Sequence, residues 1–265
     1  MRGRYFSKKI QSALGLRKPN VYSNQENKSL KQLSRQRDRV YILGTSENML
    51  SYDLSQLRDE ALITVGNFFE HPQTQELVPD LHVFAGSHPP ITHTVWKAWM
   101  TRAHEVLPAS TIIAVQYKDF EISDSVMPQR TLHHYQTGGT GIDFTQPVIA
   151  PWSVTVLALQ LALYSGFKDI RLLGVNHDWQ CCKPYRHFYD HDSPSLEYYL
   201  AQEGIIPSYE KQKQPFPKER LYKEYTLYQQ YEHLAGLAAS KNVTITNVDP
   251  KSHFDVFPKK PLVWK

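Results

Sequence analysis

Five residues with the composition of an anion-binding turn stand directly after a short apolar run. Residues 44–48 read Gly-Thr-Ser-Glu-Asn, and the run at 39–43 has the character of a buried strand. In a strand-to-helix turn, backbone amides can donate hydrogen bonds to phosphate oxygens, and hydroxyl groups add donors. The spacing is neither the dinucleotide-binding Gly-x-Gly-x-x-Gly pattern nor a P-loop. We expect a phosphate site here, with an ordinary capped turn as the alternative; the candidates are Gly44, Thr45, Ser46 and Asn48.

A second polar group follows another apolar run, at 169–175. Residues 174–178 read Gly-Val-Asn-His-Asp, so small, amide, imidazole and carboxylate groups stand together. A histidine and an aspartate in this position could position a phosphate, bind a metal or exchange protons. Alternatively, the pair could simply stabilise the loop. The candidates are Gly174, Asn176, His177 and Asp178.

The third polar group is His-Phe-Tyr-Asp-His-Asp at 187–192, preceded by Cys181 and Cys182. Such residue types occur in metal sites, but their spacing does not match that of zinc sites, and no metal is expected. Tyr189 could instead hold a phosphate or a carboxylate, and His187 could exchange a proton. Because the second and third groups share the polar segment 176–216, we interpret that segment as a lid insertion over the site.

These groups need a scaffold, and the apolar pattern predicts one. Runs rich in β-branched residues, several of them ending in glycine, predict strands, whereas apolar residues at helical spacing predict helices. Residues 154–164 are apolar on nearly all sides, which indicates a buried helix, capped by Ser153 and ended by Gly166. Residues 117–150 are expected to be irregular. The predicted strands are 39–44, 61–67, 81–87, 111–116, 169–175 and 243–247, and the predicted helices are 54–60, 94–106, 154–164 and 218–240.

Strands that alternate with helices predict an α/β fold of Rossmann-like architecture, with a mostly parallel sheet, helices on both faces and the lid insertion. In such folds ligands bind beyond the carboxyl ends of the strands. Gly44, Asn67, Ser87 and Gly174 all stand at predicted strand ends, so we expect them to converge. Asn67 could bond a base or a ribose, although capping a turn is an alternative role.

Charge divides the chain unevenly. The 265 residues carry a net charge of +4, yet residues 1–37 hold ten Lys or Arg against one acid, Glu26. We expect a basic appendage at 1–38 that contacts an anionic membrane surface, or else a solvated tail, followed by a single α/β catalytic domain at 39–265. Nucleic-acid binding is not expected because the body is not basic. Two adjacent cysteines and no long apolar span suggest a cytoplasmic protein, peripheral on the inner membrane where the tail binds.

Three stretches carry a resemblance to a known family. Val40 to Ser46 followed by Asp53, then Val65-Gly66-Asn67, and above all residues 153–178 resemble bacterial lipooligosaccharide sialyltransferases. The layout is also similar to that of motility accessory factors and an archaeal pterin diphosphokinase. The resemblance implies sugar transfer from a nucleotide donor, a CMP-linked nonulosonate or related acidic sugar, onto a surface glycan or glycolipid. By this resemblance the donor is held by Gly44, Thr45, Ser46, Asn48 and Asn67, its phosphate by Gly174, Asn176, Asp178 and Tyr189, and Ser153 lies beside it.

The sequence departs from the family at the catalytic histidine. The family has this residue just before its last long helix, where the present chain reads Leu221 to Tyr225 with no histidine. We therefore expect an inverting transfer without a metal, with proton exchange by His187, His177 or Asp178. Two other functions fit the residues: a metal-dependent, diphosphokinase-like phosphotransferase using Asp178, Asp190 and Asp192, and a non-catalytic nucleotide- or glycan-binding protein.

Overall fold

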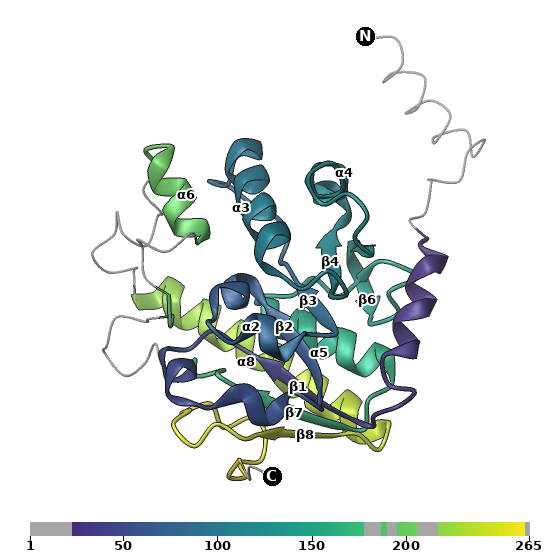
Figure 1. Cartoon of the computed structure of the whole chain (residues 1–265). Helices are drawn as coiled ribbons and strands as arrows, with labels where there is room; N and C mark the ends of the chain where they lie inside the picture. The colour runs from purple at the N-terminus through teal and green to yellow at the C-terminus, as the bar shows by residue number, and fades with distance from the viewer. Residues whose placement is uncertain (1–22, 178–186, 190–194, 206–216, 263–265) are drawn as a thin grey trace, which may run out of the picture.

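A single sheet of parallel strands forms the centre of the protein, which we describe from a computed structural model (Figure 1). The structure describes residues 23–177, 187–189, 195–205 and 217–262. Seven strands pair in the order β5-β4-β3-β2-β1-β7-β8, and every neighbouring pair is parallel. The predicted Rossmann-like α/β fold is therefore confirmed. The strands are β1 Arg39–Leu43, β2 Ala61–Val65, β3 Leu81–Val83, β4 Ile112–Gln116, β5 Leu132–Tyr135, β7 Asp169–Leu173 and β8 Thr244–Asn247.

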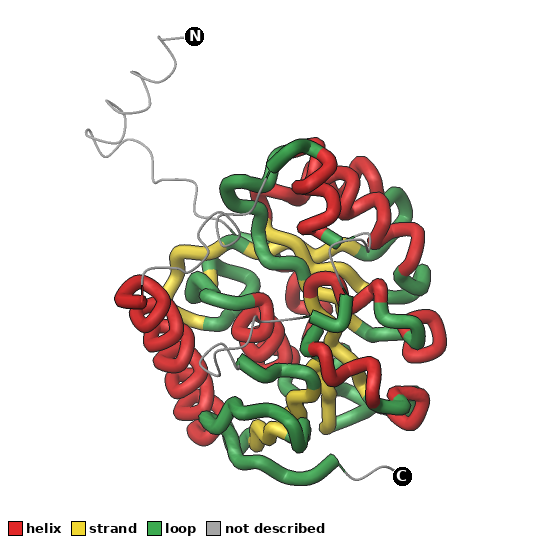
Figure 2. The backbone as a smooth tube through the Cα atoms, turned by 90° about the vertical axis from the view of Figure 1, so that its left-hand side faces the viewer, coloured by secondary structure: helices red, strands yellow, loops and turns green. Residues whose placement is uncertain are grey.

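Alternation along the strands fills two cores, because successive side chains point to opposite faces of a sheet. Val40 and Ile42 of β1 join the core on one face, whereas Tyr41 and Leu43 join the core on the other. Helices cover both faces, as Figure 2 shows for the strands in yellow and the helices in red. The first face carries η1 Gln25–Gln32, α5 Val154–Ser165 and α8 Pro217–Ser240; the second carries η2 Glu47–Ser51, η3 Leu54–Leu57, α2 Thr74–Leu77, α3 His93–Val106 and α4 Phe120–Val126.

Helix α5 lies buried across the middle of the sheet, where it packs against β1, β2 and β3. Its start is fixed by Ser153, whose hydroxyl accepts a hydrogen bond from the Val156 amide at 3.1 Å. Gly166 ends the helix with a φ of 94°, a left-handed conformation that glycine adopts without steric cost. Both ends lie where the sequence predicts them.

Residues 117–150 contain more structure than expected. After η5 Tyr117–Asp119 they form α4, the edge strand β5 and β6 Thr137–Gly141. The prediction of an irregular segment was wrong because β5 reads Leu-His-His-Tyr, which lacks a clear apolar run. His133 of β5 is nevertheless buried, and its Nδ1 lies 2.9 Å from Asn27 Oδ1 of η1.

Residues 24–33 pack on the body of the protein, ahead of the expected domain start at residue 39. Asn27 is buried and its amide donates to the Phe144 carbonyl at 2.7 Å, while Leu30 belongs to the main core. Most of the basic residues of the tail precede residue 23, outside the described part of the chain, so its expected contact with a membrane remains a prediction. No helix among the described residues is long and apolar enough to span a bilayer.

The segment expected to form a lid is described only in part. It includes Asn176 and His177, the short stretch 187–189, and α6 Leu196–Gln202, which packs against α3. Asp178, Cys181, Cys182, Asp190, His191 and Asp192 lie outside the described residues.

Candidate functional site

The strand order reverses at β1, whose neighbours are β2 on one side and β7 on the other. At this switch point the loops after β1 and β7 pass close together. The Gly44 amide donates to the Leu173 carbonyl at 2.8 Å, and the Ser46 amide donates to the Gly174 carbonyl at 3.1 Å. A Cβ atom on Gly44 would stand 2.3 Å from the Gly174 carbonyl oxygen, so only glycine permits this approach. A parallel sheet opens its ligand crevice at such a point.

Asp249, beyond the end of β8, braces the loop after β7. It is buried, and one carboxylate oxygen accepts from the Gly174 amide at 3.1 Å while the other accepts from the Tyr52 hydroxyl at 2.7 Å. Burial, and then the neighbouring carboxylate, raise the pKa of Tyr52. The phenol therefore stays protonated and keeps donating to the carboxylate.

The stretch 187–189 pairs with the loop after β1. Ser46 and His187 form an antiparallel bridge, and the Phe188 amide donates to the Thr45 carbonyl at 3.0 Å. Beyond these backbone contacts, Thr45 Oγ1 lies 2.8 Å from His187 Nδ1. Two of the predicted groups, more than a hundred residues apart in the sequence, therefore form one structural unit.

Aromatic packing holds this stretch in place. Phe188 meets Phe68 edge to face at 6.0 Å and His71 at 5.2 Å, so it anchors the stretch against η4 Gly66–Glu70. On the other side of the backbone, the rings of His187 and Tyr189 stack 4.7 Å apart, within 10° of parallel. Aromatic pairs of these geometries add to the stabilisation from burial. His187 is thus held between a hydrogen bond and a stacked ring.

A cavity of about 190 Å³ lies beside this unit, at the carboxyl ends of β1 and β2. Residues from the first loop, the second strand end, the lid, α3, α5 and α6 all contribute to its wall. Both polar and apolar groups line it, as in sites that hold a small molecule by a few oriented hydrogen bonds. The lining residues are Thr45, Val65, Gly66, Asn67, Trp99, Val154, His187, Tyr189, Leu196 and Glu197.

The cavity wall contains polar atoms whose hydrogen bonding is incomplete. Asn67 is 2% exposed, and its Oδ1 accepts from the Trp99 indole, which fixes the orientation of the amide and leaves Nδ2 as its donor. That Nδ2 has no partner among the described residues, and neither does Oε2 of Glu197. Oγ of Ser46, the residue after Thr45, also has no partner among the described residues. Because buried polar groups are almost always paired, these atoms are suited to a bound ligand or its waters.

Burial sets the protonation of His187. It lowers the pKa of His187 to about 4, and a hydrogen bond to the Thr45 backbone opposes this shift only in part. The imidazole is therefore neutral at physiological pH and can accept a proton. If Nδ1 donates to Thr45, Nε2 is the nitrogen that would take that proton.

His177, the other predicted histidine, does not line the cavity. Its Nε2 lies 2.7 Å from the Tyr231 hydroxyl, and its ring packs against Phe254 at 5.2 Å. Burial lowers the pKa of His177 to about 4, and its backbone has the left-handed φ of 47°. Tyr231 also lies 3.2 Å from Ser153 Oγ, so one phenol ties the loop after β7 to the start of α5. We therefore assign His177 a structural role in joining the loop after β7 to the start of α5.

The remaining predicted residues stand around the cavity without lining it. Ser87 is held by Asp119, which accepts from its amide at 2.8 Å. Asn48 lies in the first turn of η2, and Asn176 is buried, with no partner for its Oδ1 among the described residues. Of the thirteen predicted site residues, the structure gathers four in the cavity, and Asp178 lies outside the described part of the chain. The four are Thr45, Asn67, His187 and Tyr189.

Two wall residues with polar side chains were not predicted. Trp99 was expected only as part of the apolar face of α3, and a helical period cannot show that an indole N–H reaches the end of another strand. Glu197 stands one position inside α6, in an insertion with no periodic signal. Among the described residues, no group of three or more His, Cys, Asp or Glu is placed to hold a metal.

No protein-family profile matches the sequence, and no curated protein matches it. Solved structures with a similar chain path are sialyltransferases, the kind of protein that the sequence also resembles. CstII from Campylobacter jejuni, in complex with CMP-3FNeuAc, has a TM-score of 0.48 at 14% identity over 83% of this chain and 85% of that chain. The monofunctional alpha-2,3-sialyltransferase Cst-I from the same organism has a TM-score of 0.48 at 14% identity over 83% of this chain and 78% of its own. At this identity the likeness concerns the fold alone.

Proposed function

We propose that this protein is a glycosyltransferase that moves an acidic sugar of nonulosonate type from a CMP donor onto a glycan acceptor. The observation that carries the proposal is the cavity at the switch point of the sheet, where Thr45, Asn67, His187 and Tyr189 converge. It combines hydrogen-bond donors for a nucleotide with a neutral imidazole, and this is the combination that sugar transfer to a hydroxyl requires. The choice of CMP rests on the resemblance of the sequence.

The donor is held by the first loop and the end of β2. Asn67 offers Nδ2, which has no partner among the described residues, to a base or ribose acceptor, and Thr45 offers its hydroxyl group to the phosphate. Tyr189, beside them, donates its phenol to the same phosphate. Hydrogen bonds from these donors stabilise the nucleotide more strongly as it leaves, because negative charge develops on the phosphate oxygen.

The transfer itself is a single displacement with inversion. The acceptor hydroxyl attacks the anomeric carbon, the bond from that carbon to the phosphate oxygen breaks, and CMP departs with the electron pair. His187 takes the proton of the attacking hydroxyl, so the balance is a glycoside, CMP and one proton on the enzyme. Glu197, from α6, stabilises the positive charge that builds on the sugar ring in a transition state of oxocarbenium character.

A thermal-shift screen with CMP, UDP, GDP and ADP tests the donor. We expect CMP alone to raise the melting temperature, because a ligand that binds only the folded state stabilises it in proportion to its occupancy. Asn67→Leu should abolish the shift without lowering the melting temperature of the free protein by a comparable amount. Stabilisation by none of the four nucleotides would overturn the proposal, and stabilisation by another nucleotide would replace the donor.

Removal of divalent metal separates this reaction from a phosphotransferase. Hydroxyl groups and amides stabilise the leaving phosphate in the proposed mechanism, so turnover should persist within about twofold in EDTA. Phosphoryl transfer of the diphosphokinase kind depends on Mg²⁺. Complete loss of activity in EDTA, restored by Mg²⁺, would contradict the proposed mechanism.

A further inference from the structure

The first two turns of α8 present apolar side chains to solvent. Further along the same helix Leu234 and Ala238 are buried, whereas Leu221 is 66% exposed and Tyr225 is 62% exposed. Tyr222 is 62% exposed, and its ring meets that of Trp152, itself 47% exposed, edge to face at 6.4 Å. We call Trp152, Leu221, Tyr222 and Tyr225 the aromatic patch. Contiguous exposed side chains of this size indicate a binding surface.

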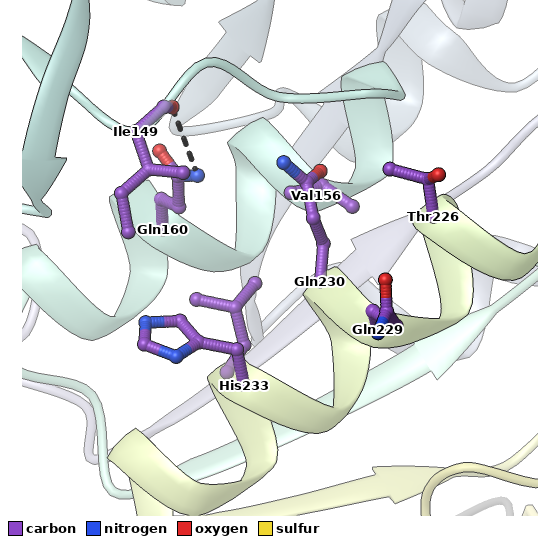
Figure 3. Close-up of a pocket in the computed structure, with 8 residues that line it drawn as sticks. Ile149, Val156, Gln160, Thr226, Gln229, Gln230 and His233 are labelled. Carbon is purple, nitrogen blue, oxygen red and sulfur yellow. Dashed lines mark hydrogen bonds between the residues drawn. The ribbon is translucent and has the colours of Figure 1, made fainter. Parts of the chain in front are cut away.

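The aromatic patch borders a second cavity, of about 290 Å³, between α5 and α8 (Figure 3). Apolar residues form its floor, and amide, hydroxyl and imidazole side chains of α8 surround it. Gln229, at its edge, donates through Nε2 to the Tyr225 hydroxyl at 2.9 Å and so joins the cavity to the patch. The lining residues are Ile149, Val156, Gln160, Thr226, Gln229, Gln230, His233 and Leu234.

Gln230 fixes the position of Trp152 relative to this cavity. Its Oε1 accepts from the Trp152 amide at 2.8 Å, and its Nε2 donates to the Ala150 carbonyl at 2.7 Å. The backbone that leads into α5 is therefore clamped to α8 by both ends of one amide. Trp152 therefore has a fixed position beside the second cavity. A ring that binds a ligand needs such a fixed position.

The cavity at the carboxyl ends of β1 and β2, which we call the donor cavity, and the second cavity lie on either side of the start of α5. Val154 lines the donor cavity, and Val156, two residues further along the first turn, lines the second cavity. Trp152 is two residues before Val154, a separation that the backbone spans in at most about 7 Å. The aromatic patch and the donor cavity are therefore linked through this short stretch of backbone at the start of α5.

We propose that the aromatic patch and the second cavity bind the uncharged saccharide chain of the acceptor. This inference rests on the proposed function, since it gives that reaction its second substrate. No Lys, Arg, Asp or Glu is among the residues described as lining the cavity, so a phosphate, sulfate or carboxylate finds no Lys or Arg partner there. A sugar ring instead offers a C–H face, which the negative face of an aromatic ring attracts, and hydroxyl groups, which pair with Gln229 and His233.

A glycan array with the full-length protein tests this inference, followed by saturation-transfer NMR on the neutral glycans that bind. We expect neutral oligosaccharides to bind. Acidic groups on an oligosaccharide should not increase its affinity. Trp152→Ala and Gln229→Ala should each weaken binding at least tenfold. Tyr117→Ala is the matched control, because Tyr117 is an aromatic residue of similar exposure, 55%, that lines neither cavity. Circular dichroism confirms that each variant is folded.

The outcomes separate this inference from the proposed function, because the thermal shift with CMP is measured on the same variants. Lost glycan binding with an unchanged CMP shift supports the acceptor site. Binding of no neutral glycan, or equal binding by Trp152→Ala and the control, overturns it even where CMP binds. The patch is instead a membrane contact if Trp152→Ala abolishes co-sedimentation with phosphatidylcholine–phosphatidylglycerol vesicles and leaves glycan binding intact. If the protein binds glycans but CMP causes no thermal shift, the patch is still a glycan site. That result would overturn both its role as an acceptor site and the proposed function.

Discussion

Thr45 and His187 lie 142 positions apart in the sequence, and their side chains meet at 2.8 Å between Oγ1 and Nδ1. The contact joins the loop after the first strand to the lid segment, and the bridge between Ser46 and His187 reinforces it. A histidine whose Nδ1 is held by a partner has a defined ring orientation, which a proton acceptor requires. The proposed nucleotide binding and proton transfer therefore fall to neighbouring residues on two paired segments.

Substitution of these two residues should separate their roles. His187→Ala should lower kcat by about 10²–10³-fold, the usual contribution of a general base, and leave the thermal shift with CMP in place. Thr45→Val keeps the side-chain volume but removes the hydroxyl, so kcat should fall about tenfold and CMP should bind more weakly. Steady-state rates and CMP titrations measure both. Full activity of His187→Ala would remove this residue from the base role.

The acid limb of the pH–rate profile should lie unusually low for a histidine. Burial lowers the pKa of His187 to about 4, so the imidazole remains a competent base from neutral pH down to about pH 5. We expect kcat/KM to be nearly flat over that interval and to fall as the pH approaches 4. Initial rates after brief exposure to each buffer avoid confusion with acid unfolding. A midpoint near 6.5 would indicate an exposed histidine or another base.

Glu197 should matter for chemistry more than for nucleotide binding. Glu197→Gln keeps the shape of the side chain and removes its negative charge, so a positive transition state loses stabilisation while an anionic donor loses a repulsive neighbour. We expect kcat to fall about tenfold or more, with KM for the donor unchanged or lower. The split between kcat and KM is the measurement. An unchanged kcat would assign Glu197 to the wall of the cavity only.

Three buried histidines should make the protein acid-sensitive. Burial lowers the pKa of His177 and His187 to about 4 and that of His82 to about 3, against about 6.5 in an unfolded chain. Between these values the unfolded state binds more protons, so the free energy of unfolding rises with pH and is lost as the pH falls below about 6.5. For each histidine, the free energy of unfolding should be lower at pH 5 than at pH 8 by on the order of 2 kcal/mol. Urea unfolding across pH 4–8 measures the slope; a flat profile would contradict it.

The sequence predicts the centre of the sheet well and its edge poorly. Strands β1, β2 and β7 are buried on both faces, so their apolar runs are unambiguous and several end at a glycine. Strand β5 lies at the edge, and His133 is buried only because η1 supplies Asn27 as its partner. Such a partner belongs to tertiary structure, and no local pattern indicates it.

The same distinction applies to the cavity. Thr45 and Asn67 follow strands directly, and the carboxyl ends of parallel strands meet at one edge, so their convergence is predictable. Trp99 and Glu197 reach the cavity from α3 and α6, whose placement depends on how helices pack over the sheet. His187 is predictable as a residue type that can exchange protons, whereas its pairing with Thr45 required the structure.

The close approach of Gly44 and Gly174 should make the switch point intolerant of any side chain. Gly44→Ala places a Cβ 2.3 Å from the Gly174 carbonyl oxygen, a backbone atom that moves only if the two loops separate. We expect a loss of roughly 2–3 kcal/mol in the free energy of unfolding, the range of overpacking in a rigid core, together with a weaker response to CMP. Gly236→Ala is the control of opposite sign: it lies in α8 with nothing within 4 Å, and alanine there should add about 0.5–1 kcal/mol. Denaturant melts of both variants decide the matter, and a Gly44→Ala protein as stable as wild type would show that the loops can part without cost.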